Sequence, residues 1–193
     1  MRAQLPYQIG GLETNVTFVD GGNTFRLYDI SHIARLYELN PEKVLERIFI
    51  SRAFTAYQMT SIILDRLQKN VEQHDSEFVI VSDISGLFLD KDISAREARE
   101  VFNQLIIHLS TFAQRNHIVV AATYLPHHLS NRNIFFKTII CGCANVIIST
   151  MPCERSQQFI LEKHPFFDLG STNFPSEDFV LTKFMETQTW AKL

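Results

Sequence analysis

The sequence has little of what several large classes of protein need. Its 193 residues contain three cysteines, too few for the disulfide framework of a small secreted domain. No apolar run approaches the ~18 residues that cross a bilayer, and the first residues lack the apolar segment of a signal peptide. The formal charge of -3 excludes a strong overall field toward nucleic acid or anionic lipid. We therefore expect a cytoplasmic protein with no membrane contact, in which any DNA contact needs a local basic patch.

Two kinds of ligand site are also poorly represented. No Gly-Lys pair occurs anywhere, so the printed sequence contains no phosphate-binding loop of the form G-x-x-x-x-G-K-[ST]. Cys141, Cys143 and Cys153 follow the pair His127-His128, but zinc sites usually have wider cysteine spacing and a recognisable second pair. We predict buried reduced thiols rather than a metal site.

The remaining composition is that of an ordinary globular protein. Hydrophobic residues make up 46% of the chain and charged residues 20%, and a length of 193 residues favours one domain with a substantial core. Four apolar runs have the length and residue types of buried strands. They are Val16–Val19, Ile48–Ile50, Phe78–Val81 and Ile118–Ala122.

Helical patterns separate these runs. They cover residues 28–37, a short stretch after Asn40, 57–71 and 94–115. Asn40 before Pro41, and Ser94 three residues before Glu97, are signals for helix N-caps. Residues 126–137 are polar and basic with little periodicity, and short strands follow at 145–149, 158–161 and 179–181. We predict a single α/β domain over residues 1–193: a mainly parallel sheet flanked by helices, with antiparallel strands added at the C-terminal edge.

Several segments, taken in order, are similar to one family. The run from Val16 to Arg26 reads Val-Thr-Phe-Val-Asp-Gly-Gly-Asn-Thr-Phe-Arg, a strand entering a Gly-Gly turn. The other segments are Gln4–Pro6 with Gly10-Gly11, Asn40–Leu45, Ser51–Phe54, Phe78–Phe88 and Leu161–Pro165. Together they resemble the core of RecA/RadA-type recombinase ATPases (RadA-, RadB- and KaiC-like proteins) from about Gln4 to Leu181. The resemblance implies a RecA-like fold, a role in DNA recombination or repair, and assembly with like subunits.

The chain departs from the family pattern at four places in the nucleotide site. The phosphate loop, which holds phosphates and Mg²⁺, is missing. Gly22 stands where active relatives carry the carboxylate that polarises the attacking water. Ser82 stands at the Walker B aspartate position, and Asp83 comes one residue later, where strand alternation turns the side chain to the other face. Tyr124-Leu125 lies where active recombinases have a glutamine that senses the γ-phosphate.

These departures predict a non-catalytic paralogue that works through a recombinase-like protein partner, self-association or single-stranded DNA. Met1 aligns just past the family's phosphate-loop helix, and a start assigned too far downstream explains the first departure but not the other three. One alternative is therefore an ATP-binding RecA/KaiC-type ATPase whose phosphate loop lies upstream, and only then are ATP and Mg²⁺ expected as cofactors. Another is a regulatory scaffold that does not contact DNA.

Four residues are candidates for a remnant of the nucleotide and Mg²⁺ site. They are Asp20, Asn23, Thr24 and Asp83. The alternative for Asp20 is that its side chain caps the Gly-Gly turn. Asn23 and Thr24 are also suited to capping the following helix. Asp83 follows a strand at the end where α/β sheets bind ligands.

The segment from His127 to Lys137 falls where the family's DNA-binding loop lies. Arg132 and Lys137 are candidates to neutralise phosphates, and Phe135 and Phe136 to stack on bases. Two cations predict weak, salt-sensitive binding of single-stranded DNA. The alternative is a polar loop whose two phenylalanines anchor it to the core.

Overall fold

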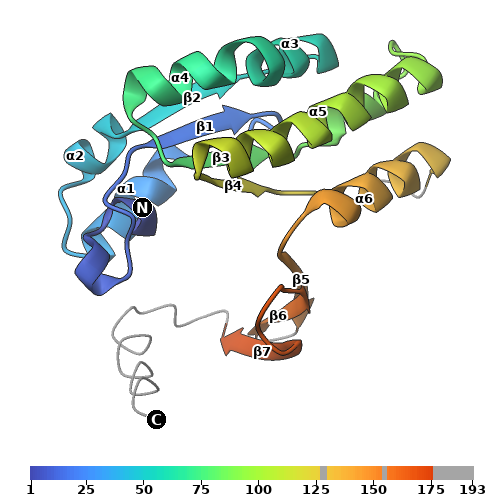
Figure 1. The fold of residues 1–193 in the computed structure, drawn as a ribbon. Helices are drawn as coiled ribbons and strands as arrows, with labels where there is room; N and C mark the ends of the chain where they lie inside the picture. The colour runs from blue at the N-terminus through green and yellow to red at the C-terminus, as the bar shows by residue number, and fades with distance from the viewer. Residues whose placement is uncertain (127–129, 154–155, 176–193) are drawn as a thin grey trace. The chain divides into compact units, whose positions relative to one another are not determined.

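The computed structural model describes residues 1–126, 130–153 and 156–175 (Figure 1). The chain divides into two compact units. One contains residues 1–35 and 39–143, and the other contains residues 36–38 and the chain from residue 144. We describe each unit by itself.

A parallel four-stranded sheet organises the first unit. Its strands lie in the order β2 (Ile48–Arg52), β1 (Val16–Asp20), β3 (Phe78–Ser82) and β4 (Val119–Ala122). All neighbouring pairs are parallel. The α/β fold with a mainly parallel sheet is thus confirmed, and β2 and β4 are its edge strands among the described residues.

Helices connect the strands and flank the sheet (Figure 1). They are α1 (Leu27–Leu36), α2 (Pro41–Glu46), α3 (Ala56–Ser61), α4 (Leu67–His74), α5 (Ala95–Asn116) and α6 (Asn131–Cys143). A π-helical stretch, Ile62–Arg66, joins α3 to α4. Both predicted N-caps are confirmed: Asn40 accepts the amides of Glu42 and Lys43, and Ser94 accepts that of Glu97. No helix in the described ranges combines the length and apolar character needed to cross a bilayer.

The two faces of the parallel sheet are buried to different extents. Val19, Val79 and Val81 are fully buried and belong to a cluster with residues of α3, α4 and α5. On β3 the alternate residues Phe78 and Ile80 are only half-buried. The apolar character of β3 predicted that helices cover both faces of this strand. Within the described chain, only the face that carries Val79 and Val81 is fully covered.

Helix α6 replaces a predicted polar segment without periodicity. Only Asn133 and Phe136 on this helix are buried, and Asn133 is polar. The helix therefore has no stripe of buried apolar residues that would reveal it in the sequence. Ser130 accepts the Asn133 amide at 3.1 Å, and the Phe136 ring lies 4.2 Å from the Phe102 ring on α5. Packing against α5 therefore specifies a helix that the sequence pattern does not reveal.

The second unit contains a separate antiparallel sheet of β5 (Ile147–Cys153), β6 (Ser156–Lys163) and β7 (Gly170–Pro175). The antiparallel strands were predicted, and they pair with one another. Strand β7 was missed because its glycine and proline indicated turns. The predicted strand at 179–181 lies outside the described residues.

Candidate functional site

The carboxyl ends of the parallel strands bring several polar residues to one edge of the sheet. Asp20 ends β1, Arg52 ends β2 and Ser82 ends β3. The register pairs Asp20 with both Arg52 and Ser82. Parallel sheets commonly bind ligands at this edge, so the predicted site residues lie in the expected place.

Asp20 is fully buried, and structural partners occupy both of its oxygens. Oδ1 accepts the Thr24 amide at 2.8 Å and the Ser82 hydroxyl at 2.9 Å. Oδ2 accepts the Phe25 amide at 3.3 Å and the Arg52 guanidinium at 3.2 Å. The interpretation of Asp20 as the cap of the Gly-Gly turn is therefore supported.

These partners also set the charge of Asp20. Burial raises its pKa, but the hydrogen bonds from Thr24, Ser82 and Phe25, with the charge of Arg52, outweigh that effect. The net pKa lies below the ordinary carboxyl value, and the carboxylate is ionised at neutral pH. Its charge stabilises the turn and the ends of three strands.

Asn23 and Thr24 form the turn that Asp20 caps. Asn23 adopts the left-handed conformation with φ 52°, and Thr24 gives its amide to Asp20. Helix α1 begins only at Leu27, so neither residue occupies its N-cap position. The expectation that they cap this helix is wrong because Phe25 and Arg26 still separate them from its first residue, Leu27.

Gly22 has no room for the carboxylate of active relatives. A Cβ atom added there would lie 2.8 Å from the Asp83 Cβ and 2.9 Å from the Thr24 Cγ2. Real Cβ atoms essentially never approach other atoms below 3.0 Å, so a longer side chain at this position requires the turn to move.

Asp83 leaves β3 in a left-handed conformation, with φ 44°. Asp83 therefore lies in a turn rather than in the strand, and the alternation of side chains along β3 does not set its direction. The turn brings Asp83 close to Gly22. Its amide donates to the Thr123 hydroxyl at 2.9 Å, and its Oδ1 accepts the Gly86 amide at 3.2 Å. A Cβ at Gly86 would collide with the carboxylate. The acid thus lies within a tight turn, and its role toward Mg²⁺ stays a prediction.

The end of β4 is attached to α6. The Tyr124 hydroxyl donates to the Asn133 side chain at 2.7 Å. Burial raises the pKa of this phenol. Tyr124, at the position that resembles the γ-phosphate sensor, therefore hydrogen-bonds to helix α6.

Most of the predicted DNA-binding residues pack α6 onto the rest of the first unit. Arg132 donates to the backbone oxygens of Phe88, Asp90 and Ile93 at 2.8 to 3.2 Å. Phe136 is fully buried, whereas Lys137 is exposed.

Phe135 is half-buried, with the Arg99 guanidinium 5.2 Å from its ring centre. These positions support the alternative that the phenylalanines anchor the segment. Residues 127–129 lie outside the described chain, and DNA contact stays a prediction.

The cysteines lie on two different elements. Cys141 and Cys143 are half-buried on α6, and Cys153 is exposed on β5, so predicted burial is wrong for Cys153. None of the three forms a disulfide in the described structure. Within the described ranges no group of three or more His, Cys, Asp or Glu residues is placed to hold a metal ion.

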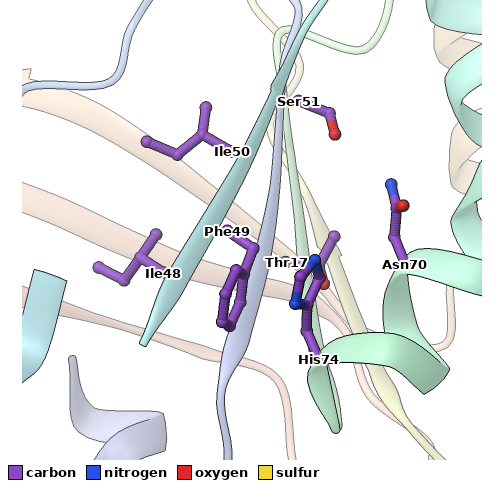
Figure 2. A pocket seen from close by; sticks show the side chains of 7 residues that line it. All are labelled: Thr17, Ile48, Phe49, Ile50, Ser51, Asn70 and His74. Atoms are coloured by element: carbon purple, nitrogen blue, oxygen red, sulfur yellow. The ribbon is translucent and has the colours of Figure 1, made fainter. Parts of the chain in front are cut away.

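A pocket between β2 and α4 was not found from the sequence. It has a volume of about 260 Å³ (Figure 2). The lining residues are Thr17, Ile48, Phe49, Ile50, Ser51, Asn70 and His74. The rings of Phe49 and His74 stack with centres 3.7 Å apart. The only sequence signal was Thr17, a polar residue inside an apolar strand, and its position beside Phe49 requires knowledge of the register.

Comparison with known proteins identifies the parallel-sheet unit. The sequence profile of the Rad51 family matches residues 1–131. The chain is also 29% identical over 124 residues to the meiotic recombination protein DMC1 of Saccharomyces cerevisiae. That match covers 62% of this chain and 36% of DMC1, so the chain spans only about a third of that relative's length.

Proposed function

This chain belongs to the Rad51 family, and we propose that it serves DNA recombination or repair through a protein partner, without hydrolysing ATP. The observation that carries the proposal is the state of Asp20. It is the one carboxylate on the strand that leads into the Gly-Gly turn, and four structural contacts occupy it. A group engaged in this way has no lone pair directed at a substrate.

Phosphoryl transfer needs carboxylates that position Mg²⁺ and a group that orients the nucleophile. Asp83 is the only other predicted acid at this edge, and its carboxylate lies within the turn that contains Gly86. Gly22 offers no side chain and is packed against Asp83. These contacts support a structural role for the edge in preference to turnover.

The whole protein can still bind nucleotide if a phosphate loop precedes this chain. In that case we expect ATP and Mg²⁺ to bind without turnover. Nucleotide binding alone would therefore leave the proposal intact, whereas turnover would not.

A partner surface is available along the outer strand β2 of the sheet. Strand β2 pairs with β1 on one side and has no described strand on the other. An exposed strand edge can pair with an extended peptide through backbone hydrogen bonds. The pocket beside β2 gives such a peptide a place for one side chain.

The test is ATP turnover by the purified full-length protein with Mg²⁺, with and without single-stranded DNA. We expect no turnover above that of the Asp83→Asn variant, which keeps the oxygen that accepts the Gly86 amide. Turnover that Asp83→Asn abolishes would refute the proposal. The Lys137→Ala variant tests whether this exposed lysine contributes to binding of single-stranded DNA. It leaves in place the Arg132 contacts that hold α6.

A further inference from the structure

One histidine organises the loop between β6 and β7. The backbone amides of Phe166 and Phe167 donate to the His164 Nδ1 atom at 3.1 and 2.9 Å. A side chain that accepts the amides two and three residues further on is the arrangement of a helix N-cap or an Asx turn. Pro165 lies between them, and its fixed φ suits such a turn. His164 thus takes the place that Asp or Asn has in most turns of this kind, but it titrates near neutral pH.

The same loop places three large apolar side chains in solvent. Phe166, Phe167 and Leu169 are 89%, 71% and 62% exposed. The His164 ring stacks on that of Phe167 with ring centres 4.4 Å apart, and the Phe166 ring lies edge-on to it at 6.2 Å. Residues 165–169, here called the tip, therefore present two aromatic rings in an arrangement that His164 sets. Clustered apolar side chains on a surface are typical of contact sites.

The two hydrogen bonds also fix the protonation state of His164. An imidazole nitrogen that accepts hydrogen bonds carries no proton, so the ring is neutral and its proton is on Nε2. Protonation would turn Nδ1 into a donor, and both amides would lose this acceptor. Histidine ordinarily changes its charge between about pH 5 and pH 8. A modest fall in pH is therefore sufficient to break both hydrogen bonds at once.

The charges around His164 are of mixed sign. Within the hairpin its charged neighbours along the chain are Lys163 and Asp168, and Glu162 on β6 accepts a hydroxyl of β5. Residues 36–38 belong to the same unit and add the exposed carboxylate of Glu38. Strands β5 and β7, as described, contain no Asp, Glu, Lys, Arg or His. Both amides, in contrast, act in one direction, because each requires the neutral ring.

We propose that His164 is a pH-sensitive latch, which holds the tip while its ring is neutral and releases the tip when Nδ1 takes up a proton from water. The step forms one N–H bond and breaks the two hydrogen bonds to Nδ1. A partner that recognises the paired rings would meet them in a fixed arrangement only above the titration of His164. The latch goes beyond the proposed function, since it involves neither nucleotide nor the edge of the parallel sheet.

The experiment is NMR spectroscopy of the isotope-labelled full-length protein from about pH 8 down to about pH 5. At the upper end we expect the Nε2–H tautomer of His164, which the chemical shifts of the two ring nitrogens identify. As the pH falls, the amide protons of Phe166 and Phe167 should shift upfield because they lose their acceptor. Their midpoint should equal that of the His164 ring.

Two variants isolate the Nδ1 atom. His164→Asn is the matched control, because the Asn Oδ1 can take the place of Nδ1 and accepts amides without titrating. Its two amide signals should stay at the latched position throughout. His164→Ala has no acceptor, and its signals should stay at the released position. At equal pH the two amides should exchange with solvent about fivefold faster in His164→Ala than in His164→Asn, the typical effect of one net hydrogen bond.

Three results would overturn the proposal. The first is an Nδ1–H tautomer at the upper pH, which is measured on the unmodified protein and needs no variant. The second is a pair of amide signals that stay fixed while the His164 ring titrates. The third is an equal pH response of these amides in His164→Asn.

Discussion

The carboxyl edge of the parallel sheet and the region beside its outer strand β2 differ in whether their buried polar groups have hydrogen-bond partners. At the carboxyl edge, Asp20 has a partner for each oxygen and lies next to a glycine turn that excludes further side chains. Beside β2, Thr17 is just as deeply buried but has no hydrogen-bond partner among the described residues, and it lines a pocket. The resemblance to an ATPase predicts a ligand site at the carboxyl edge. The hydrogen bonds and the pocket indicate that the group still able to bind a ligand lies beside β2.

The difference shows how to separate a structural polar group from a binding one. A satisfied buried group stabilises the fold and has no capacity left for a ligand. An unsatisfied group beside a pocket reduces stability until something binds. The predictions below test this distinction, starting with the largest expected effect.

Asp20→Ala should cause the largest loss of stability. It removes the acceptor for two amides and the Ser82 hydroxyl and leaves Arg52 without its ion-pair partner. Removing the buried acceptor of three donors typically lowers the free energy of unfolding by about 3 kcal/mol. The ion pair adds little to this loss because the Arg52 side chain is 39% exposed. Urea unfolding measures the change. A loss below about 1 kcal/mol would show that Asp20 is not a structural group.

Gly22→Glu, which restores the carboxylate of active relatives, should be the next most damaging change. The new Cβ meets Asp83 and Thr24 below 3.0 Å, and overpacking of this kind costs about 2 kcal/mol. The control is Gly142→Glu on α6, where a Cβ has nothing within 4 Å and helix propensity improves. Thermal unfolding of the two variants gives the comparison. A stable Gly22→Glu protein that hydrolyses ATP would contradict our account.

Acid should weaken the carboxyl edge selectively. Because hydrogen bonds and Arg52 hold the folded pKa of Asp20 below its ordinary value, its stabilising contribution is present above the unfolded pKa of about 3.9. The contribution is lost as pH falls through the lower folded pKa. Urea unfolding from pH 7 to pH 3 should show a smaller acid loss for Asp20→Asn. Parallel curves for both proteins would contradict the assignment.

The smallest effects should have opposite signs in the two regions. Ser82→Ala removes a hydroxyl that donates to Asp20 and should cost about 1 kcal/mol. Thr17→Val removes a hydroxyl that has no partner within the described part of the chain, and it should stabilise the free protein by about 1 kcal/mol. Both changes are measured in one denaturation series. A destabilising Thr17→Val would mean that its hydroxyl has a partner.

The fold was largely predictable because its signals are local. Apolar runs marked the four parallel strands, and Asn40 and Ser94 marked helix starts through hydrogen bonds to their own neighbours. Helix α6 was not predictable in this way. Its buried residues, Asn133 and Phe136, show their role only when packed against Tyr124 and Phe102.

The candidate sites were predictable to different degrees. The location of Asp20 and Asp83 followed from the carboxyl ends of parallel strands, but the left-handed turn at Asp83 did not follow from residue spacing. The pocket depends on the register between β1 and β2 and on the position of α4. Thr17 and His74 line the same pocket although they are far apart in the sequence, so no local pattern predicts that they lie close together.

The most direct test of the central claim is a recombination assay in the organism that carries the gene. Two single substitutions are compared, Asp83→Asn at the carboxyl edge and Thr17→Val in the pocket, after both proteins are shown to be present at normal levels. Our account predicts that Thr17→Val lowers the recombination frequency and that Asp83→Asn does not. A loss with Asp83→Asn and none with Thr17→Val would show that the carboxyl edge still acts as a nucleotide site, and the account would be wrong.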